Sequence, residues 1–142
     1  MASILKVDDL RGNTSAGDIT ITSEGGAATQ SLQQGLAKVW INFNGTGSIA
    51  SRDSFSVSSL TDDGTGSYDI NFSNNTGNAN YAYDVTCANT SSPFMRHFWV
   101  DDVANATTSK VQAQTLYVAT TSGGGTNADA ILVNVAVHGD LA

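Results

Sequence analysis

The chain has 142 residues, of which 40% are hydrophobic, enough for one domain with a core. Only 13% are charged, and the net charge of −7, with six scattered lysines and arginines, argues against binding to nucleic acid or anionic lipid. Fourteen glycines and a single proline favour tight turns between strands over long helices.

The first thirty residues differ from the rest and are predicted to form an extended attachment arm. Residues 3–7 and 18–22 are short apolar pieces with the character of strands, too short to bury a core of their own. Residues 29–37 are the only segment that favours a helical turn or two, with Thr29 or Ser31 as its cap. The N-terminus does not have the pattern of a signal peptide, and no apolar run approaches the roughly 20 residues of a membrane span.

From residue 38 onward, apolar and polar residues alternate with the period of a β-strand. This pattern predicts strands at residues 38–44, 54–60, 67–72, 81–88, 95–100, 110–121 and 128–138. The Asp63-Gly64 pair predicts a hairpin, because glycine accepts a positive φ without strain. We therefore expect an all-β fold, an antiparallel β-sandwich of jelly-roll-like type. Residues 1–30 would form the arm and residues 31–142 the body.

The sequence offers little that indicates catalysis. His97 and His138 each lie alone on a predicted strand, without a partner at the spacing of a zinc site. Cys87 is the only cysteine and falls on an inward-facing position, which favours a buried structural thiol and rules out an intrachain disulfide. No serine stands in a G-x-S-x-G elbow, and the glycine-rich segments join strand to strand. We predict no catalytic site, no metal and no cofactor, and hence no enzyme.

Pairs of aspartates are the one pattern that raises the question of a cation. Calcium takes clustered carboxylates, but no alternating D-x-D-x-D loop is present. The middle pair lies in the predicted hairpin, where aspartate is favoured by turn chemistry alone. A turn is therefore the favoured interpretation, and calcium stays open, for Asp8-Asp9, Asp62-Asp63 and Asp101-Asp102.

Aromatic and apolar side chains on the outward faces weakly indicate a binding surface. Trp40 and Phe98 alternate out of phase with the main apolar set of their strands. Tryptophan and other aromatics are enriched at subunit interfaces, and they also form platforms for glycans. The candidate interface residues are Ile4, Leu5, Val7 and Leu10 in the arm and Trp40, Phe98 and Trp99 in the body.

Two segments carry a resemblance to a known family. Residues 35–47 read GLAKVWINFNGTG, and residues 51–72 read SRDSFSVSSLTDDGTGSYDINF. Together they resemble a module in tail-fibre and other structural proteins of marine tailed bacteriophages. Those proteins carry an A-K-[AV]-W-[IV]-N-F-[ND]-G-T-G run, then R-D-S-[FY]-N-V-[ST]-S and D-x-G-T-G-x-Y. Residues 4–11, ILKVDDLR, are similar to the leader at the start of such proteins.

The resemblance implies a non-enzymatic structural protein of the virion, made in the cytoplasm of the host bacterium. It implies a fibre- or knob-like appendage, commonly a homotrimer. We expect the arm to attach it to other virion proteins and the polar loops to face the host surface, where a glycan is a candidate partner. The chain departs from longer fibres because it has no shaft or coiled-coil segment. Two alternatives therefore stay open: a capsid decoration (cement) protein that stabilises the head shell, and a carbohydrate-binding module. Neither nucleic acid nor a membrane is expected as a partner.

Overall fold

The computed structural model describes residues 4–15, 19–88, 96–99, 106–118 and 125–142. The chain divides into two compact units, Met1–Leu36 and Ala37–Ala142. The division falls after Leu36, whereas the sequence placed the start of the body at residue 31. The difference arises because the short helix contacts the strand that precedes it.

The N-terminal unit consists of a small hairpin followed by one helical turn. Its elements are β1 (Thr20–Thr22), β2 (Thr29–Ser31), which pairs antiparallel with β1, and α1 (Leu32–Gly35). Ser31 is the N-cap of α1, as predicted, and its Oγ accepts a hydrogen bond from the Gln34 backbone N–H (3.5 Å). One expectation was wrong: residues 29–31 belong to a strand and not to the helix, because they pair with β1. The extended piece predicted at residues 18–22 contains β1, and the described residues 4–15 contain no paired strand.

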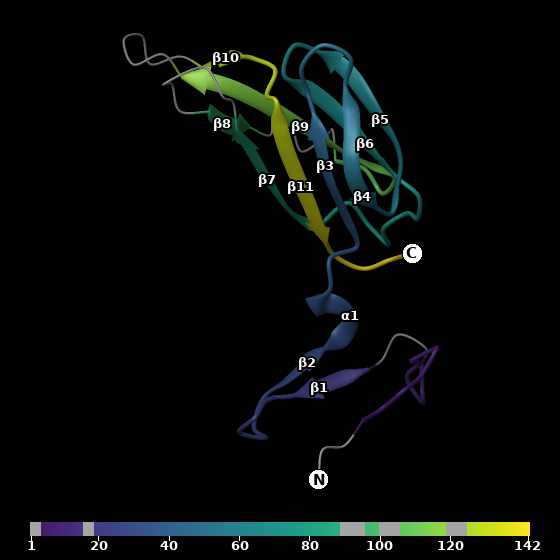
Figure 1. The fold of residues 1–142 in the computed structure, drawn as a ribbon. Helices are drawn as coiled ribbons and strands as arrows, with labels where there is room; N and C mark the ends of the chain where they lie inside the picture. Colours follow the sequence, from purple (N-terminus) through teal and green to yellow (C-terminus); the bar gives the residue numbers. More distant parts are fainter. Residues whose placement is uncertain (1–3, 16–18, 89–95, 100–105, 119–124) are drawn as a thin grey trace. The chain divides into compact units, whose positions relative to one another are not determined.

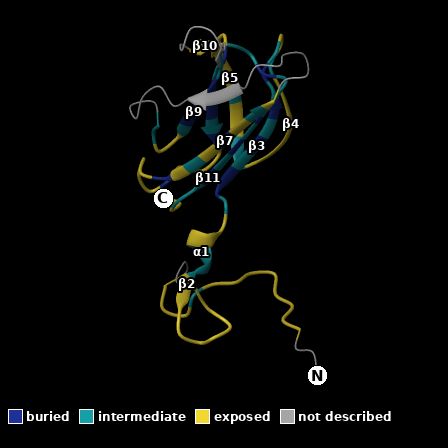
Figure 2. Ribbon diagram, turned by 90° about the vertical axis from the view of Figure 1, so that its left-hand side faces the viewer, coloured by how far each residue is buried: buried dark blue, intermediate teal, exposed yellow. Residues whose placement is uncertain are grey.

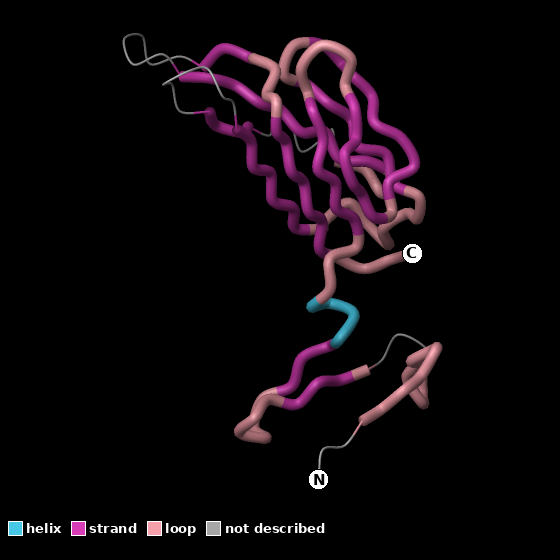
Figure 3. Tube along the Cα trace, in the orientation of Figure 1, coloured by secondary structure: helices cyan, strands magenta, loops and turns pink. Residues whose placement is uncertain are grey.

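The body is a sandwich of two antiparallel sheets (Figures 1 and 3). One sheet has the order β4-β3-β11-β7; the other has the order β10-β9-β6-β5, with β8 also paired to β9. The prediction of an all-β antiparallel sandwich is therefore confirmed. The strands are β3 (Val39–Asn44), β4 (Ala50–Phe55), β5 (Val57–Gly64), β6 (Ser67–Phe72), β7 (Ala82–Ala88), β8 (Arg96–Trp99), β9 (Lys110–Val118), β10 (Gly125–Asn127) and β11 (Leu132–His138).

Alternate residues of the central strands form the core between the sheets. Along β3 and β11, buried positions alternate regularly with half-buried ones (dark blue and teal in Figure 2). Each fully buried aliphatic or aromatic side chain contributes about 1.5–3 kcal/mol to folding. The core includes Val39, Ile41, Phe43, Tyr68, Ile70, Phe72, Val85, Val111, Val133, Val135 and Val137.

The chain crosses from one sheet to the other at Ser56. This serine has a φ of 60°, a backbone conformation that non-glycine residues rarely adopt. Phe55, at the end of β4, is 55% exposed, while Val57, at the start of β5, packs against the core. The single strand predicted over residues 54–60 was therefore wrong, because a corner separates two strands of different sheets.

Most other strands follow the prediction, with differences at their ends and one strand that was not predicted. β6 has the predicted bounds, and a hairpin joins β5 to β6 as expected. Its turn is at Thr65-Gly66 rather than at Asp63-Gly64, because Asp63 and Gly64 belong to β5 and Gly64 pairs with Ser67. β11 begins at Leu132 rather than at residue 128, and the short strand β10 was not anticipated. The predicted end of the strand at residues 119–121 lies outside the described residues.

The glycines and tyrosine of the family-like segments meet in one corner of the sandwich. The hydroxyl of buried Tyr68 donates to the Gly45 carbonyl (3.0 Å), and Asp129 Oδ1 lies 3.2 Å from the same hydroxyl. The Gly66 N–H donates to that carboxylate oxygen (2.7 Å). A Cβ on Gly45 would lie 2.6 Å from Tyr68 Cζ, so this position has no room for a side chain. Gly45 and Gly66, one glycine of each G-T-G run, are therefore required by packing within the chain.

Candidate functional site

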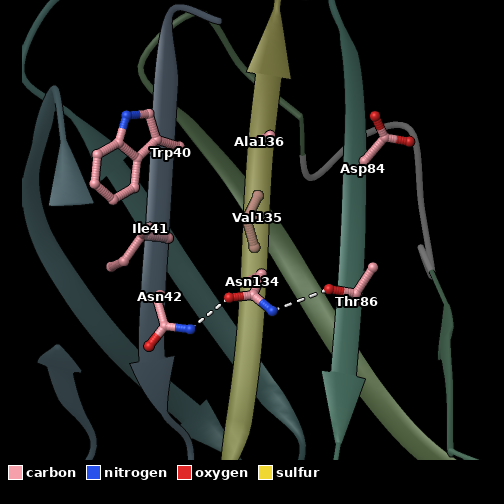
Figure 4. A pocket seen from close by; sticks show the side chains of 8 residues that line it. All are labelled: Trp40, Ile41, Asn42, Asp84, Thr86, Asn134, Val135 and Ala136. Carbon is pink, nitrogen blue, oxygen red and sulfur yellow. Dashed lines mark hydrogen bonds between the residues drawn. The ribbon is translucent and has the colours of Figure 1, made fainter. Parts of the chain in front are cut away.

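A hollow of about 380 Å³ lies on the outer face of the sheet that contains β3, β11 and β7 (Figure 4). Its lining comes from outward-facing positions on all three strands, and from the backbone between them. These strands are rigid parts of the sandwich, since their inward-facing residues are buried in the core. The outward-facing side chains are Trp40, Asn42, Asp84, Thr86, Asn134 and Ala136.

One row across the hollow consists of Trp40, Ala136 and Asp84. The strand register places Ala136 between the other two, opposite Trp40 on one side and Asp84 on the other. Neighbouring strands lie about 4.8 Å apart, so roughly 9.5 Å separates the strands that carry Trp40 and Asp84. Because Ala136 has only a methyl group, this row has an apolar floor with an indole on one side and a carboxylate on the other.

The next row is a polar ladder of Asn42, Asn134 and Thr86. Asn42 Nδ2 donates to Asn134 Oδ1 (2.5 Å), and Asn134 Nδ2 donates to Thr86 Oγ1 (3.1 Å). These bonds hold the two amides in fixed orientations (dashed lines in Figure 4). Each amide nitrogen has a second N–H, and the threonine hydroxyl can still donate. The ladder therefore retains hydrogen-bonding capacity toward a ligand.

Arg52 supports the end of this ladder. Its guanidinium donates to the backbone carbonyls of Phe43 (2.9 Å) and Ile131 (2.5 Å). The register between β3 and β4 shifts between Asn42 and Phe43, as in a β-bulge, and the guanidinium bridges this irregularity. Arg52 thus has a structural role in the R-D-S segment, which sequence reasoning did not assign.

Among the described residues that line the hollow, Asp84 is the single ionisable one, and none of the described side chains pairs with its carboxylate. Across the described ranges there is no cluster of three or more histidine, cysteine or acidic residues that could hold a metal ion.

The aspartate pairs lie elsewhere. Asp62 and Asp63 lie in β5 rather than in the hairpin turn, and Asp62 Oδ1 accepts from the Gly64 N–H (2.9 Å) at the register shift between β5 and β6. Asp9 pairs with Arg11 (2.5 Å). Asp101 and Asp102 lie outside the described residues.

The opposite sheet carries an ion pair that is structural. Lys110 Nζ lies 2.5 Å from Asp69 Oδ2, and the Gln112 amide donates to Asp69 Oδ1 (3.3 Å). The hydrogen bond to Asp69 raises the pKa of Lys110. Since β6 and β9 pair at these positions, the network joins the two central strands of their sheet.

Of the predicted site residues, Trp40 lies where the alternation places it, on the face opposite the core, and it forms part of the hollow. The side chains of Phe98 and Trp99 lie outside the described part of the structure, as does that of His97. His138 is half-buried on β11, and Cys87 is half-buried against the core. The four arm residues Ile4, Leu5, Val7 and Leu10 are exposed and are not part of the hollow.

Sequence reasoning missed the remaining residues of the hollow. Asn42, Asn134, Thr86 and Asp84 all occupy outward positions of predicted strands, so the alternation carried a signal for each of them. The sequence does not reveal which strands are neighbours, and the hollow depends on β11 lying between β3 and β7.

Comparison with protein-family models, with curated proteins and with solved structures finds no match to this chain. Within the described residues, no helix has the length and apolar character needed to span a bilayer.

Proposed function

We propose that this protein is a non-enzymatic structural protein of a tailed-phage virion. In this proposal the β-sandwich is the body of a fibre- or knob-like appendage that contacts the host surface, and the N-terminal unit attaches it to the particle. The resemblance of residues 35–72 to virion modules supports the assignment to a phage.

The observation that carries the proposal is a group of exposed apolar side chains in a unit that has no core. Among its described residues, 4–15 and 19–36, none is buried. Ile4 and Leu5 are 78% and 77% exposed, and Val7 and Leu10 are 54% and 51% exposed. Exposed apolar side chains gathered in one short segment are typical of a surface that a partner covers. We propose that this partner is another virion protein.

An unpaired sheet edge supports self-association of the body. Within the described residues, β4 is an edge strand that pairs only with β3, and all six of its residues are exposed. Such an edge offers backbone N–H and C=O groups to another strand, and association with further copies protects it. We propose a homo-oligomer, and the family resemblance favours three copies.

The chemistry of the hollow supports binding over catalysis. Cleavage of a glycoside by the common mechanisms uses two carboxyl groups on opposite sides of the bond. The described lining of the hollow contains one carboxylate, that of Asp84. We therefore propose that this face recognises a ligand without transforming it.

Polar substitution of the arm tests the attachment role. A phage that encodes the chain is engineered to carry Ile4→Ser, Leu5→Ser, Val7→Ser and Leu10→Ser together, with Leu141→Ser as control. Leu141 is 40% exposed in the body, so its replacement makes an exposed apolar position polar outside the arm.

The arm variant is expected to fold normally, because it removes no buried side chain, and to be depleted at least tenfold from purified particles. The control is expected to incorporate normally. Normal incorporation of a folded arm variant would show that these side chains do not attach the protein.

A further inference from the structure

We infer that the hollow formed by Trp40, Ala136, Asp84 and the Asn42–Asn134–Thr86 ladder is a binding site for a neutral pyranose of a saccharide. This inference rests on the proposed function in one respect, because it names the ligand of the face that would contact the host. The geometry itself belongs to the body alone, and the site is complete within one chain.

The arrangement of apolar and polar groups fits the two chemical aspects of a sugar ring. A pyranose presents C–H groups on its faces and hydroxyl groups around its rim. The indole of Trp40 and the methyl group of Ala136 offer carbon surface for the C–H groups. The ladder and Asp84 flank that surface with donors and acceptors (Figure 4). The volume of about 380 Å³ lies within the range of small-ligand sites, roughly 300–1,000 Å³.

The charge of the site favours a neutral ring over an acidic one. Asp84 is the single ionisable residue in the part of the lining that the structure describes, and the chain has a net charge of −7. Sugar hydroxyls donate to carboxylates, whereas a uronate or sialate would place a second negative charge beside Asp84. The Arg52 guanidinium is directed to two backbone carbonyls.

A saccharide also fits this face better than a peptide strand or a second copy of the chain does. β3 and β11 are paired on both sides, so their backbone groups are occupied and cannot add a strand. An apolar side chain packed on the hollow would bury the Asp84 carboxylate, which no described side chain pairs, and an uncompensated buried charge is costly. Hydroxyl groups compensate that charge.

The test measures saccharide binding by the full chain with saturation-transfer difference NMR. The probes are the methyl glycosides of glucose, galactose, mannose and N-acetylglucosamine, with methyl glucuronide as the acidic comparison. The variants are Trp40→Ala and Asp84→Asn, and Asp53→Asn is the matched control. Asp53 is an exposed aspartate on the same sheet, opposite Asn42, and it does not line the hollow. Circular dichroism establishes that each variant is folded.

We expect at least one neutral glycoside to bind in the millimolar range, with saturation transferred to its ring protons, and the glucuronide to bind more weakly. Trp40→Ala and Asp84→Asn are each expected to weaken binding at least tenfold, and Asp53→Asn less than twofold. Should Trp40→Ala fail to fold, the conservative Asp84→Asn still decides the question.

Three results would overturn the inference: no binding of any neutral glycoside, binding that neither variant weakens, or a change of oligomeric state by light scattering in Trp40→Ala without a change in binding. The last result would assign the face to a contact between copies. Failure here is separate from failure of the proposed function, because the hollow variants are expected to enter particles normally whichever ligand they bind.

Discussion

Replacement of Gly66 by alanine tests whether close packing against the backbone requires glycine at this position. Gly66 has a φ of +69°, and a Cβ there would lie 2.8 Å from the backbone nitrogen of Ala128 and even closer to the Thr115 carbonyl oxygen. The left-handed conformation costs an alanine about 1–2 kcal/mol, and the clash with backbone atoms adds about 1–3 kcal/mol. Gly66→Ala is therefore expected to lower the free energy of unfolding by roughly 2–5 kcal/mol.

Gly47 provides the matched control for this prediction. Its φ is +64°, but a Cβ there would meet nothing within 4 Å. Gly47→Ala therefore carries the conformational cost alone, about 1–2 kcal/mol. Urea unfolding followed by far-UV circular dichroism measures both variants, and the two m-values should agree with that of the parent chain. Equal losses of stability in the two variants would refute the argument that close backbone approach, rather than φ, requires glycine at position 66.

Three further predictions concern the body. Tyr68→Phe removes the hydroxyl shared with Asp129 and should cost about 1–2 kcal/mol in urea unfolding; an unchanged midpoint would contradict this. Burial raises the pKa of Tyr68 and of Tyr81 to about 12, so the unfolded chain loses these protons first, near pH 10. The contribution of these two groups to stability should be complete below pH 10 and should be lost between pH 10 and 12. The melting temperature of the parent chain should therefore fall more steeply over this range than that of Tyr68→Phe, and equal slopes would contradict the prediction. Arg52→Gln, which loses charged donors to two backbone carbonyls, should cost about 1–3 kcal/mol by the same urea assay, and a loss no greater than in Asp53→Asn would argue against its bridging role.

The alternating pattern predicted strands well wherever one strand stays within one sheet. The bounds of β6 matched because Tyr68, Ile70 and Phe72 all face the same core. The pattern misled at Ser56, since Phe55 and Val57 keep the alternation while the chain turns from one sheet to the other. The alternating pattern continues through Ser56, so the sequence pattern alone does not reveal that the chain changes sheet there.

The hollow shows what the alternating pattern does not predict. Alternation gave the correct face for Trp40, and the same reasoning applies to Asn42 and Asn134. Their assembly into one site depends on the long-range pairing of β11 with β3 and β7. Outward polar residues are common in any sandwich, so only the sheet order distinguishes these from the rest.

Antibody labelling of intact particles tests the central proposal most directly. Antibodies against the β-sandwich are applied to purified virions of a phage that encodes the chain, and gold particles are located by electron microscopy. The proposed function predicts gold at the tail. Gold distributed over the head shell would assign the protein to capsid decoration, and its absence from purified particles, with the protein left free in the lysate, would contradict a virion role.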